Sequence, residues 1–447
     1  MMPRMSGSAL EFDVAVIGAG AAGLCAAAQL CASGRTVALL EARDRIGGRI
    51  DSRALPELDL PIELGAEFVH GDARVTRSLL QAAGLAIVDT SGRHAGRRSD
   101  AGEIRDSLFA QARELLAPAR ELAQDQSVEQ FLLACGAAQE PIAAFVRAMV
   151  EGFDAADPRR ASVRAIASEW CGDSLQAQGR PLGGYAPLLA ALRRQLTPSR
   201  AQILLGTRVE AIEWGGASVR IAARRGEHSV QVRAARAVIA LPLSILQLPA
   251  DAPGAVRFEP PLTDKRVALQ GLALGPVIKV VMYFRQSFWE QWQHGEFADA
   301  GFLRAPAAPF PTLWTALPFR VPVLTAWMGG PRAQALQGAS REQLIDQALA
   351  SVRQALDWPR DPLDELVAAH MHDWSSDEYS RGAYSYIAVG GEDAPRLLAE
   401  PLRERLFFAG EATDPDNSGT VEAALQSGQS AAERLLASAS IQVRKRP

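Results

Sequence analysis

Three glycines at a fixed spacing are the first residues that point to chemistry. Gly18, Gly20 and Gly23 follow a short apolar run and precede an alanine-rich stretch. In such a pattern the first glycine makes a tight turn, the second lets the backbone approach a pyrophosphate, and the third lets a helix pack closely on a strand. The phosphates then lie at the N-terminus of that helix, where free N–H groups and the helix dipole favour an anion. The pattern therefore predicts a dinucleotide-binding site.

A carboxylate and two arginines behind this loop extend the prediction. Glu41 ends a second apolar run, about 20 residues beyond the first glycine, where an acidic side chain accepts hydrogen bonds from ribose hydroxyls. Arg43, Gly48 and Arg49 follow in one short segment and combine bare backbone with positive charge for a phosphate. The glycine pattern alone leaves FAD and NAD as alternatives.

Lys279 is a second candidate for chemistry. Only three of the 47 basic residues are lysines, and this one lies inside the apolar run VIKVVMYF. A buried cation costs several kcal/mol of desolvation unless another group compensates. The residues themselves leave two interpretations open, which are a lysine on the exposed face of an edge strand and a buried lysine with a function.

The hydrophobic pattern predicts the elements that must position these residues. Residues 12–17 predict a buried parallel strand, residues 24–33 a helix, and residues 36–41 a second strand, so the chain opens with a β-α-β unit. Residues 201–240 predict several short strands of alternating pattern. The chain closes with a strand, a polar turn and a helix from about Val421 to Ala437.

Composition narrows the class of protein. The chain of 447 residues is 48% hydrophobic and 22% charged, with a formal net charge of −4, which argues against a disordered chain and against a nucleic-acid partner. Four scattered cysteines favour a reducing compartment. No apolar segment has the length of a signal peptide or a membrane span. We therefore expect a cytoplasmic protein with no membrane partner and no metal site.

Motifs along most of the chain resemble the flavin-containing amine oxidases, the family of monoamine oxidases, polyamine oxidases and histone-lysine demethylases. The motifs are EARDRIGGR (41–49), ELGAEFVHG (63–71), TRVEAI (207–212), LPLSIL (241–246), GPVIKVVMYF (275–284), WSSDEYSRGAYSY (374–386) and FAGEATDPDNSGTVEAALQSG (408–428). The resemblance implies a soluble bacterial member with an α/β fold. In that fold a GxGxxG-type, Rossmann-like FAD-binding domain (10–90, 196–265 and 402–438) is interleaved with an α+β substrate-binding domain (91–195 and 266–401).

The resemblance also implies which residues contact the cofactor. They are Gly18, Gly20, Gly23, Glu41, Ala42, Arg43, Gly48, Arg49, Gly65, Ala66, Glu67, Phe68, Val209, Trp374, Gly410, Glu411, Thr420 and Val421. The last helix would point its N-terminus at the flavin pyrimidine and stabilise the anionic reduced ring. Ala383 stands where monoamine oxidases carry the cysteine bonded to the flavin, so FAD should be held non-covalently.

Lys279, Tyr384 and His70 are the catalytic candidates that the resemblance implies. Lys279 would hold a water near flavin N5 and favour electron delivery to oxygen. Tyr384 would form the first aromatic wall beside the flavin, and Thr420 occupies the position of the second, which puts a preference for arylalkylamines in doubt. His70 would face the substrate amine. Glu67, beside Phe68 in sequence, is the first candidate for an acid that stabilises the substrate cation.

The expected reaction is oxidation of an amine C–N bond to an imine by hydride transfer to flavin N5. O2 would reoxidise the flavin and give H2O2, and the imine would hydrolyse to an aldehyde and an amine or ammonia. A polyamine-like or other alkylamine is the favoured substrate, and the protein is expected to be a monomer or homodimer. Two alternatives stay open, an L-amino-acid oxidase and a non-catalytic flavin-binding protein; the first needs an arginine that the loop GAEFVHG does not supply.

Overall fold

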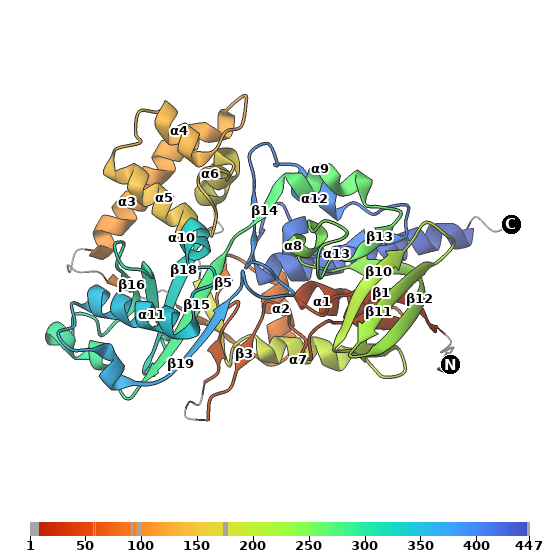
Figure 1. Ribbon diagram of the computed structural model, residues 1–447, viewed down its shortest axis with the longest axis horizontal. Coiled ribbons are helices and arrows are strands. Elements are labelled where there is room, and N and C mark those ends of the chain that lie inside the picture. Colours follow the sequence, from red (N-terminus) through yellow and green to blue (C-terminus); the bar gives the residue numbers. More distant parts are fainter. Residues whose placement is uncertain are drawn as a thin grey trace.

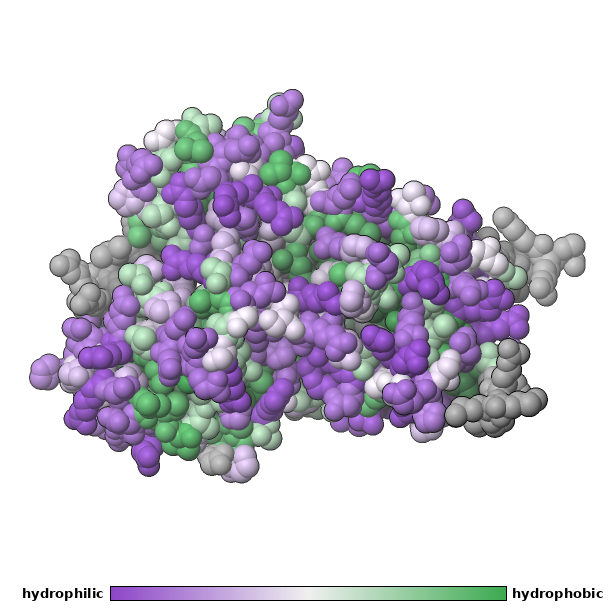
Figure 2. Space-filling model, in the orientation of Figure 1, coloured by the Kyte–Doolittle hydropathy of each residue, from purple (hydrophilic) through white to green (hydrophobic). Residues whose placement is uncertain are grey.

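The computed structural model describes residues 9–56, 58, 60–90, 93–95, 101–172 and 178–444. Two sheets organise the fold, and they lie at opposite ends of the molecule (Figure 1). Hydrophilic residues dominate the face shown in Figure 2, with hydrophobic ones in small groups between them. Within the described part of the chain, no helix is long and apolar enough to cross a membrane.

The first sheet holds the predicted β-α-β unit. Its strands run in the order β13-β10-β11-β12-β1-β2-β9, with β21 paired to β12. Their bounds are β13 Arg257–Glu259, β10 Thr207–Glu213, β11 Val219–Arg225, β12 His228–Ile239, β1 Leu10–Ile17, β2 Val37–Leu40, β9 Ala201–Leu204 and β21 Leu406–Phe408. β1 pairs in parallel with both β12 and β2. Within the range 201–240, where several short strands were expected, His228–Ile239 forms the single long strand β12.

Both faces of this sheet are covered, which explains why its central strands are uninterrupted apolar runs. Val14 and Val16 pack with the helices α1 (Ala21–Ala32), α7 (Ala186–Gln195) and α13 (Val421–Arg444). The alternate residues Ala15 and Ile17 pack on the other side, with the side chains of β10 to β12. The predicted last helix is therefore present as α13 and extends beyond Ala437.

The second sheet carries Lys279. Its strands follow the order β19-β15-β18-β17-β16-β7, with bounds β19 Leu366–Asp373, β15 Val277–Phe284, β18 Val323–Gly329, β17 Thr312–Thr315, β16 Ala300–Arg304 and β7 Arg93–Ala95. Helix α11 (Arg341–Leu356) packs on this sheet. A group of helices lies beside it (Figure 1): α3 Ala101–Leu116, α4 Val128–Ala134, α5 Pro141–Gly152 and α6 Val163–Cys171.

Shorter elements connect the two sheets. A small sheet has the order β5-β8-β6, with β5 Val69–His70, β8 Gln178–Pro181 and β6 Ile87–Asp89. The other short elements are β3 Ser52–Arg53, β4 Ile62–Glu63, α2 Arg74–Ala82, α8 Leu243–Leu246, α9 Arg266–Gln270, β14 Leu272–Leu274, α10 Gly330–Ala335, β20 Ser385–Ile387 and α12 Ala394–Ala399. The strands of the first sheet fall within the ranges expected for the FAD-binding domain; the exact domain boundaries stay a prediction.

Candidate active site

One continuous cavity of about 1190 Å³ runs from the glycine loop of the first sheet to the second sheet. All of the cofactor and catalytic residues expected from the sequence line it, except Gly23. A Cβ on Gly23 would lie 1.9 Å from the carbonyl oxygen of Gly18. This glycine therefore has the packing role expected of it, because only a residue without a side chain lets α1 approach the loop so closely.

The glycine loop forms a cradle of bare backbone. Gly20 is the N-cap of α1 and supplies no side-chain hydrogen bond to its first turn. It forms a β-bridge with Gly47, and a Cβ on Gly48 would come within 3.3 Å of the Gly20 Cα. Two glycine segments and the N-terminus of a twelve-residue helix thus meet in the cavity. This donor set fits the pyrophosphate of a dinucleotide.

Glu41 completes the cradle at the end of β2. One of its carboxylate oxygens accepts a hydrogen bond from the Ala19 N–H at 2.7 Å, and the other accepts from the Arg43 N–H at 2.9 Å. Burial raises the pKa of this carboxyl, although both N–H groups and the Arg43 guanidinium oppose the shift. The side chain is held in place by backbone and lies on the cavity wall, as a ribose-binding carboxylate requires.

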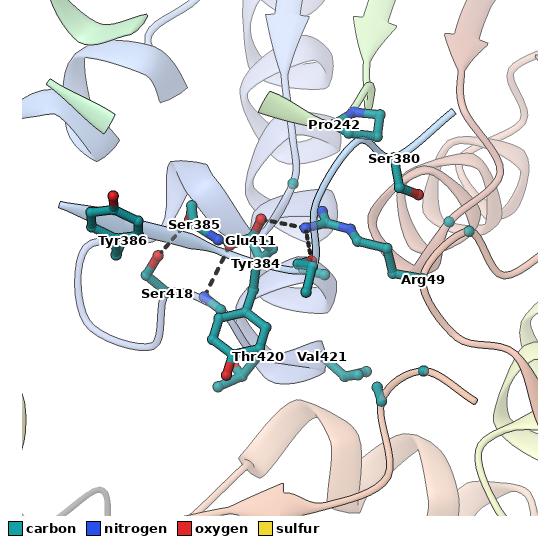
Figure 3. A pocket seen from close by; sticks show the side chains of 18 of the residues that line it. Arg49, Pro242, Ser380, Tyr384, Ser385, Tyr386, Glu411, Ser418, Thr420 and Val421 are labelled. Carbon is teal, nitrogen blue, oxygen red and sulfur yellow. Dashed lines mark hydrogen bonds and ion pairs between the residues drawn. The ribbon is translucent and has the colours of Figure 1, made fainter. Parts of the chain in front are cut away.

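Arg43 and Arg49 are both paired with carboxylates, which the sequence did not reveal. Arg43 donates to Asp377 Oδ1 at 2.5 Å and to Ser380. Arg49 donates to Glu411 Oε1 at 2.7 Å and to the Ala383 carbonyl at 2.7 Å (Figure 3). Both still line the cavity, but each brings a compensated charge to it rather than the free positive charge that we expected for a phosphate.

Glu411 anchors the loop that precedes α13. Its Oε2 accepts hydrogen bonds from the Ser385 hydroxyl at 2.6 Å and from the Gly419 N–H at 3.0 Å. Ser385 in turn contacts the Ser418 hydroxyl at 2.9 Å. Figure 3 shows these groups converging beside Thr420 and Val421 at the start of α13. The network therefore fixes the N-terminus of this long helix against the cavity, where its dipole favours negative charge.

Lys279 is buried in the interior of the second sheet. β15 pairs with β18 on one side and β19 on the other, so it is not an edge strand. The side chain is 1% exposed, and Nζ donates to Glu67 Oε2 at 2.7 Å and to the Gly65 carbonyl at 3.1 Å. The interpretation as an exposed lysine is wrong, and the compensating group that a buried cation needs is Glu67.

The carboxylate of Glu67 is bound by side chains of the protein, which leaves it unavailable to a substrate. Besides Lys279, it accepts a hydrogen bond from Arg180 at 3.0 Å and from the Trp314 indole N–H at 3.1 Å. Desolvation raises the pKa of Glu67, but Lys279 and Arg180 outweigh it and hold the pKa below its ordinary value. With its carboxylate engaged in this way, Glu67 is not available as the acid for a substrate cation that the sequence led us to consider.

Tyr384 is part of a larger aromatic wall than the sequence indicated. Its hydroxyl donates to the Phe153 carbonyl at 2.5 Å, and its ring lies nearly parallel to that of Trp327, with centroids 6.4 Å apart. Trp314 packs next to Trp327 at 5.7 Å. Trp314 and Trp327 lie on β17 and β18, two strands that our sequence analysis did not identify. Trp327 pairs with Lys279 in register. The short, nearly continuous apolar run VLTAWMG was the available sequence signal for this strand.

Two other expected residues lie in the same wall. Trp374 is buried and donates its indole N–H to the Leu64 carbonyl at 3.0 Å, close to Gly65. The His70 ring lies 5.9 Å from that of Phe153 and lines the cavity. Desolvation lowers the pKa of His70 to about 4. This histidine is therefore neutral at physiological pH.

Because His70 is neutral, it should not contribute to the pH dependence of flavin reduction. A histidine with a pKa of about 4 does not change its charge between pH 6 and pH 9. We therefore expect His70→Asn to leave the shape of the pH profile of anaerobic flavin reduction unchanged over that range. Stopped-flow measurement of the wild type and the variant checks this. The disappearance of an ionisation from the variant's profile would show that His70 titrates during the reaction.

Comparisons with known proteins agree with this geometry. The sequence profile described as "Flavin containing amine oxidoreductase" matches residues 21–436, and the chain belongs to that family. It is 30% identical to polyamine oxidase 2 of Arabidopsis thaliana, over 94% of this chain and 87% of that protein. It is 26% identical to human lysine-specific histone demethylase 2, over 95% of this chain and 53% of that protein.

Solved structures confirm the fold. A structure of putrescine oxidase bound to putrescine aligns with a TM-score of 0.77 at 23% identity, over 96% of this chain and all of that one. Cyclohexylamine oxidase from Brevibacterium oxydans aligns with a TM-score of 0.76 at 22% identity, over 96% of this chain and 99% of that one. The chain is thus a flavin-dependent amine oxidase with FAD as its cofactor, as the sequence motifs predicted.

Proposed function

We propose that this enzyme oxidises aliphatic alkylamines and holds FAD without a covalent bond. The observation that carries the proposal is the continuity of the cavity, which joins the glycine cradle to the buried Lys279 and to the aromatic wall at Tyr384. Bound FAD supplies the redox chemistry, accepting hydride from the amine carbon and passing electrons to O2. The cytoplasmic location and the monomeric or homodimeric state expected from the sequence stay predictions.

The aromatic residues of the cavity favour the neutral form of the bound amine. An alkylamine has a pKa of about 10.4 in water, and only its neutral form has the lone pair that supports hydride loss. The apolar surfaces of Tyr384, Trp327 and Phe68 disfavour the charged form by desolvation. Cation–π attraction opposes this by roughly 0.5–2 kcal/mol. Since desolvation can shift an amine by up to about 3–5 pKa units, the wall favours the neutral, reactive amine.

The aliphatic class is supported by two observations. Thr420 lines the cavity at the position where the resemblance places a second aromatic wall in monoamine oxidases. Two of the four relatives described above are named for polyamines and putrescine. An L-amino-acid oxidase is the second candidate, because Arg304 also lines the cavity and an arginine there could bind a substrate carboxylate.

A panel of amines with peroxide detection tests the proposal. We expect H2O2 from n-butylamine, putrescine, spermidine or spermine, weaker activity with benzylamine and tyramine, and none with free L-amino acids. Activity confined to amino acids would favour the second candidate. If no amine reduces the flavin in anaerobic stopped-flow experiments, the protein is a non-catalytic flavin-binding protein and the proposed function is wrong.

The non-covalent cofactor gives a separate prediction. Ala383 lines the cavity beside Tyr384 and offers no thiol, and none of the four cysteines is among the described residues of the cavity wall. We expect precipitation of the purified protein with acid to release all of the FAD into the supernatant, measured by its absorbance. Flavin that stays with the precipitated polypeptide would contradict this.

A further inference from the structure

Arg180 is a buried cation to which the reaction described so far gives no part. It lies on β8 and is 8% exposed. Its Nε and Nη2 atoms are both 3.0 Å from Oε1 of Glu67, and it donates to the backbone carbonyls of Thr315 and Leu317. Arg180 is not among the described residues that line the main cavity, whereas its neighbours Glu67 and Phe68 are. Arg180 therefore acts on the cavity from behind these two residues.

The carboxylate of Glu67 is shared between two cations. Its Oε2 accepts a hydrogen bond from Lys279 at 2.7 Å, while its Oε1 accepts one from Arg180. Lys279 and Glu67 by themselves would form a neutral pair, whose field falls off faster with distance than the field of a single charge. Two cations and one anion instead give the three side chains a net charge of +1. The protein thus keeps a positive charge beside the cavity although Lys279 has a counterion.

The surroundings preserve this net charge. Within the described part of the chain, no second carboxylate forms an ion pair with Lys279 or Arg180. Glu63 is close enough to Lys279 and Glu67 to interact with their charges, but burial raises the pKa of Glu63 to about 7, so at pH 6 it is mostly neutral. The Trp314 ring lies 5.4 Å from Nζ of Lys279. In such desolvated surroundings a charge is screened less than it is in water.

We propose that Arg180 is a positioning residue for reoxidation by O2. It engages one oxygen of Glu67 and thereby leaves Lys279 with an effective positive charge toward the cavity. In this half of the reaction O2 takes two electrons and one proton from the reduced cofactor and a second proton from solvent, which gives H2O2. Negative charge develops on oxygen during the transfer, and preorganised positive charge stabilises it. The inference goes beyond the proposed function and does not depend on which amine is oxidised.

Variants that change the net charge in opposite directions test this role. The holoenzyme is reduced photochemically at pH 6, so that no amine is needed, and is then mixed with O2 in a stopped-flow instrument. Arg180→Gln removes the net charge and should slow reoxidation about 10-fold, which is less than the loss of a group on the cavity wall itself. Arg180→Lys keeps the charge and should recover most of the rate. Glu67→Gln adds one positive charge and should reoxidise at least as fast as the wild type.

The double variant Arg180→Gln, Glu67→Gln separates charge from structure. It restores a net charge of +1, so it should reoxidise faster than Arg180→Gln alone, whereas two purely structural losses would add. The midpoint reduction potential of the bound FAD, measured by spectroscopic titration, is a readout that does not depend on rate. Because the reduced flavin ring is anionic, Arg180→Gln should lower this potential and Glu67→Gln should raise it.

Arg332→Gln is the matched control. Arg332 also pairs with a carboxylate, that of Glu151, and donates to the Pro306 carbonyl, but it is not among the described residues of the cavity wall. Its loss should change neither the rate nor the potential. Reoxidation of Arg180→Gln at the wild-type rate, no recovery in Arg180→Lys, or a double variant slower than Arg180→Gln overturns the proposal.

FAD content and urea midpoint show which variants are folded. If Arg180→Gln does not retain FAD, Glu67→Gln carries the test, and a potential that is unchanged or lower in this variant overturns the proposal. Wild-type protein that no amine reduces would contradict the proposed function instead, because photochemical reduction still allows reoxidation to be measured.

Discussion

Replacement of Lys279 by methionine is expected to slow reoxidation of the reduced enzyme by O2 about 100-fold, while anaerobic reduction by an amine changes much less. The reason is electrostatic: Nζ is buried on the cavity wall, and reduction of O2 develops negative charge that a preorganised cation stabilises. The loss of one such group from a water-excluded site costs about 10²- to 10³-fold in rate. Stopped-flow mixing of reduced enzyme with O2 measures the reoxidation rate directly.

The same experiment needs a control for structure. Methionine keeps most of the length of lysine, and it leaves Glu67 paired with Arg180, so the variant should retain FAD. Equal oxygen reactivity of variant and wild type would show that the charge of Lys279 stabilises the fold and does not assist reoxidation. A variant that loses FAD is compared after reconstitution at saturating cofactor, so that reoxidation is measured on the same flavin content.

Replacement of Glu67 by leucine is expected to have the largest effect on stability. It leaves Lys279, which is 1% exposed, without its counterion, and the removal of one partner from a buried ion pair costs about 3–5 kcal/mol. Arg180 also loses Glu67, but it keeps its hydrogen bond to the Thr315 carbonyl at 2.9 Å. Its contribution to the loss of stability should therefore be smaller than that of Lys279. Urea denaturation at a fixed excess of FAD gives the loss in free energy of unfolding.

The double variant Glu67→Leu, Lys279→Met isolates the pair. It removes the stranded cation together with its partner, so it should be more stable than Glu67→Leu alone, and the difference from additivity measures the coupling between the two residues. If the two losses add, the ion pair does not stabilise the fold. Glu378→Gln serves as the matched control, because that acid is exposed and its loss should change stability by less than about 0.5 kcal/mol.

The pH dependence of this stability has a definite sign. Because the pKa of Glu67 is lower in the folded protein than its ordinary value, its contribution is complete above the pKa of the unfolded chain. It is lost as the pH falls through the folded pKa. The stability difference between wild type and Glu67→Leu should therefore be largest near neutral pH and should shrink in acid.

The dinucleotide-binding unit could be predicted from the sequence alone. β1, α1 and β2 with Gly18, Gly20 and Glu41 lie within one short stretch of chain, so their geometry depends on local periodicity and on glycine conformation. The apolar run around Lys279 left both an exposed and a buried lysine open, and the structure shows that the lysine is buried. Motif resemblance then placed distant residues such as Val209 and Glu411 at the same site, and the structure brings them to one cavity.

Which charged side chains pair with one another could be seen only in the folded chain. Lys279 and Glu67 are 212 residues apart in sequence, and Arg180 and Glu67 are 113 apart. The physical reason is that burial and pairing energies depend on distance in space. Local patterns specify secondary structure, but the fold alone sets those distances.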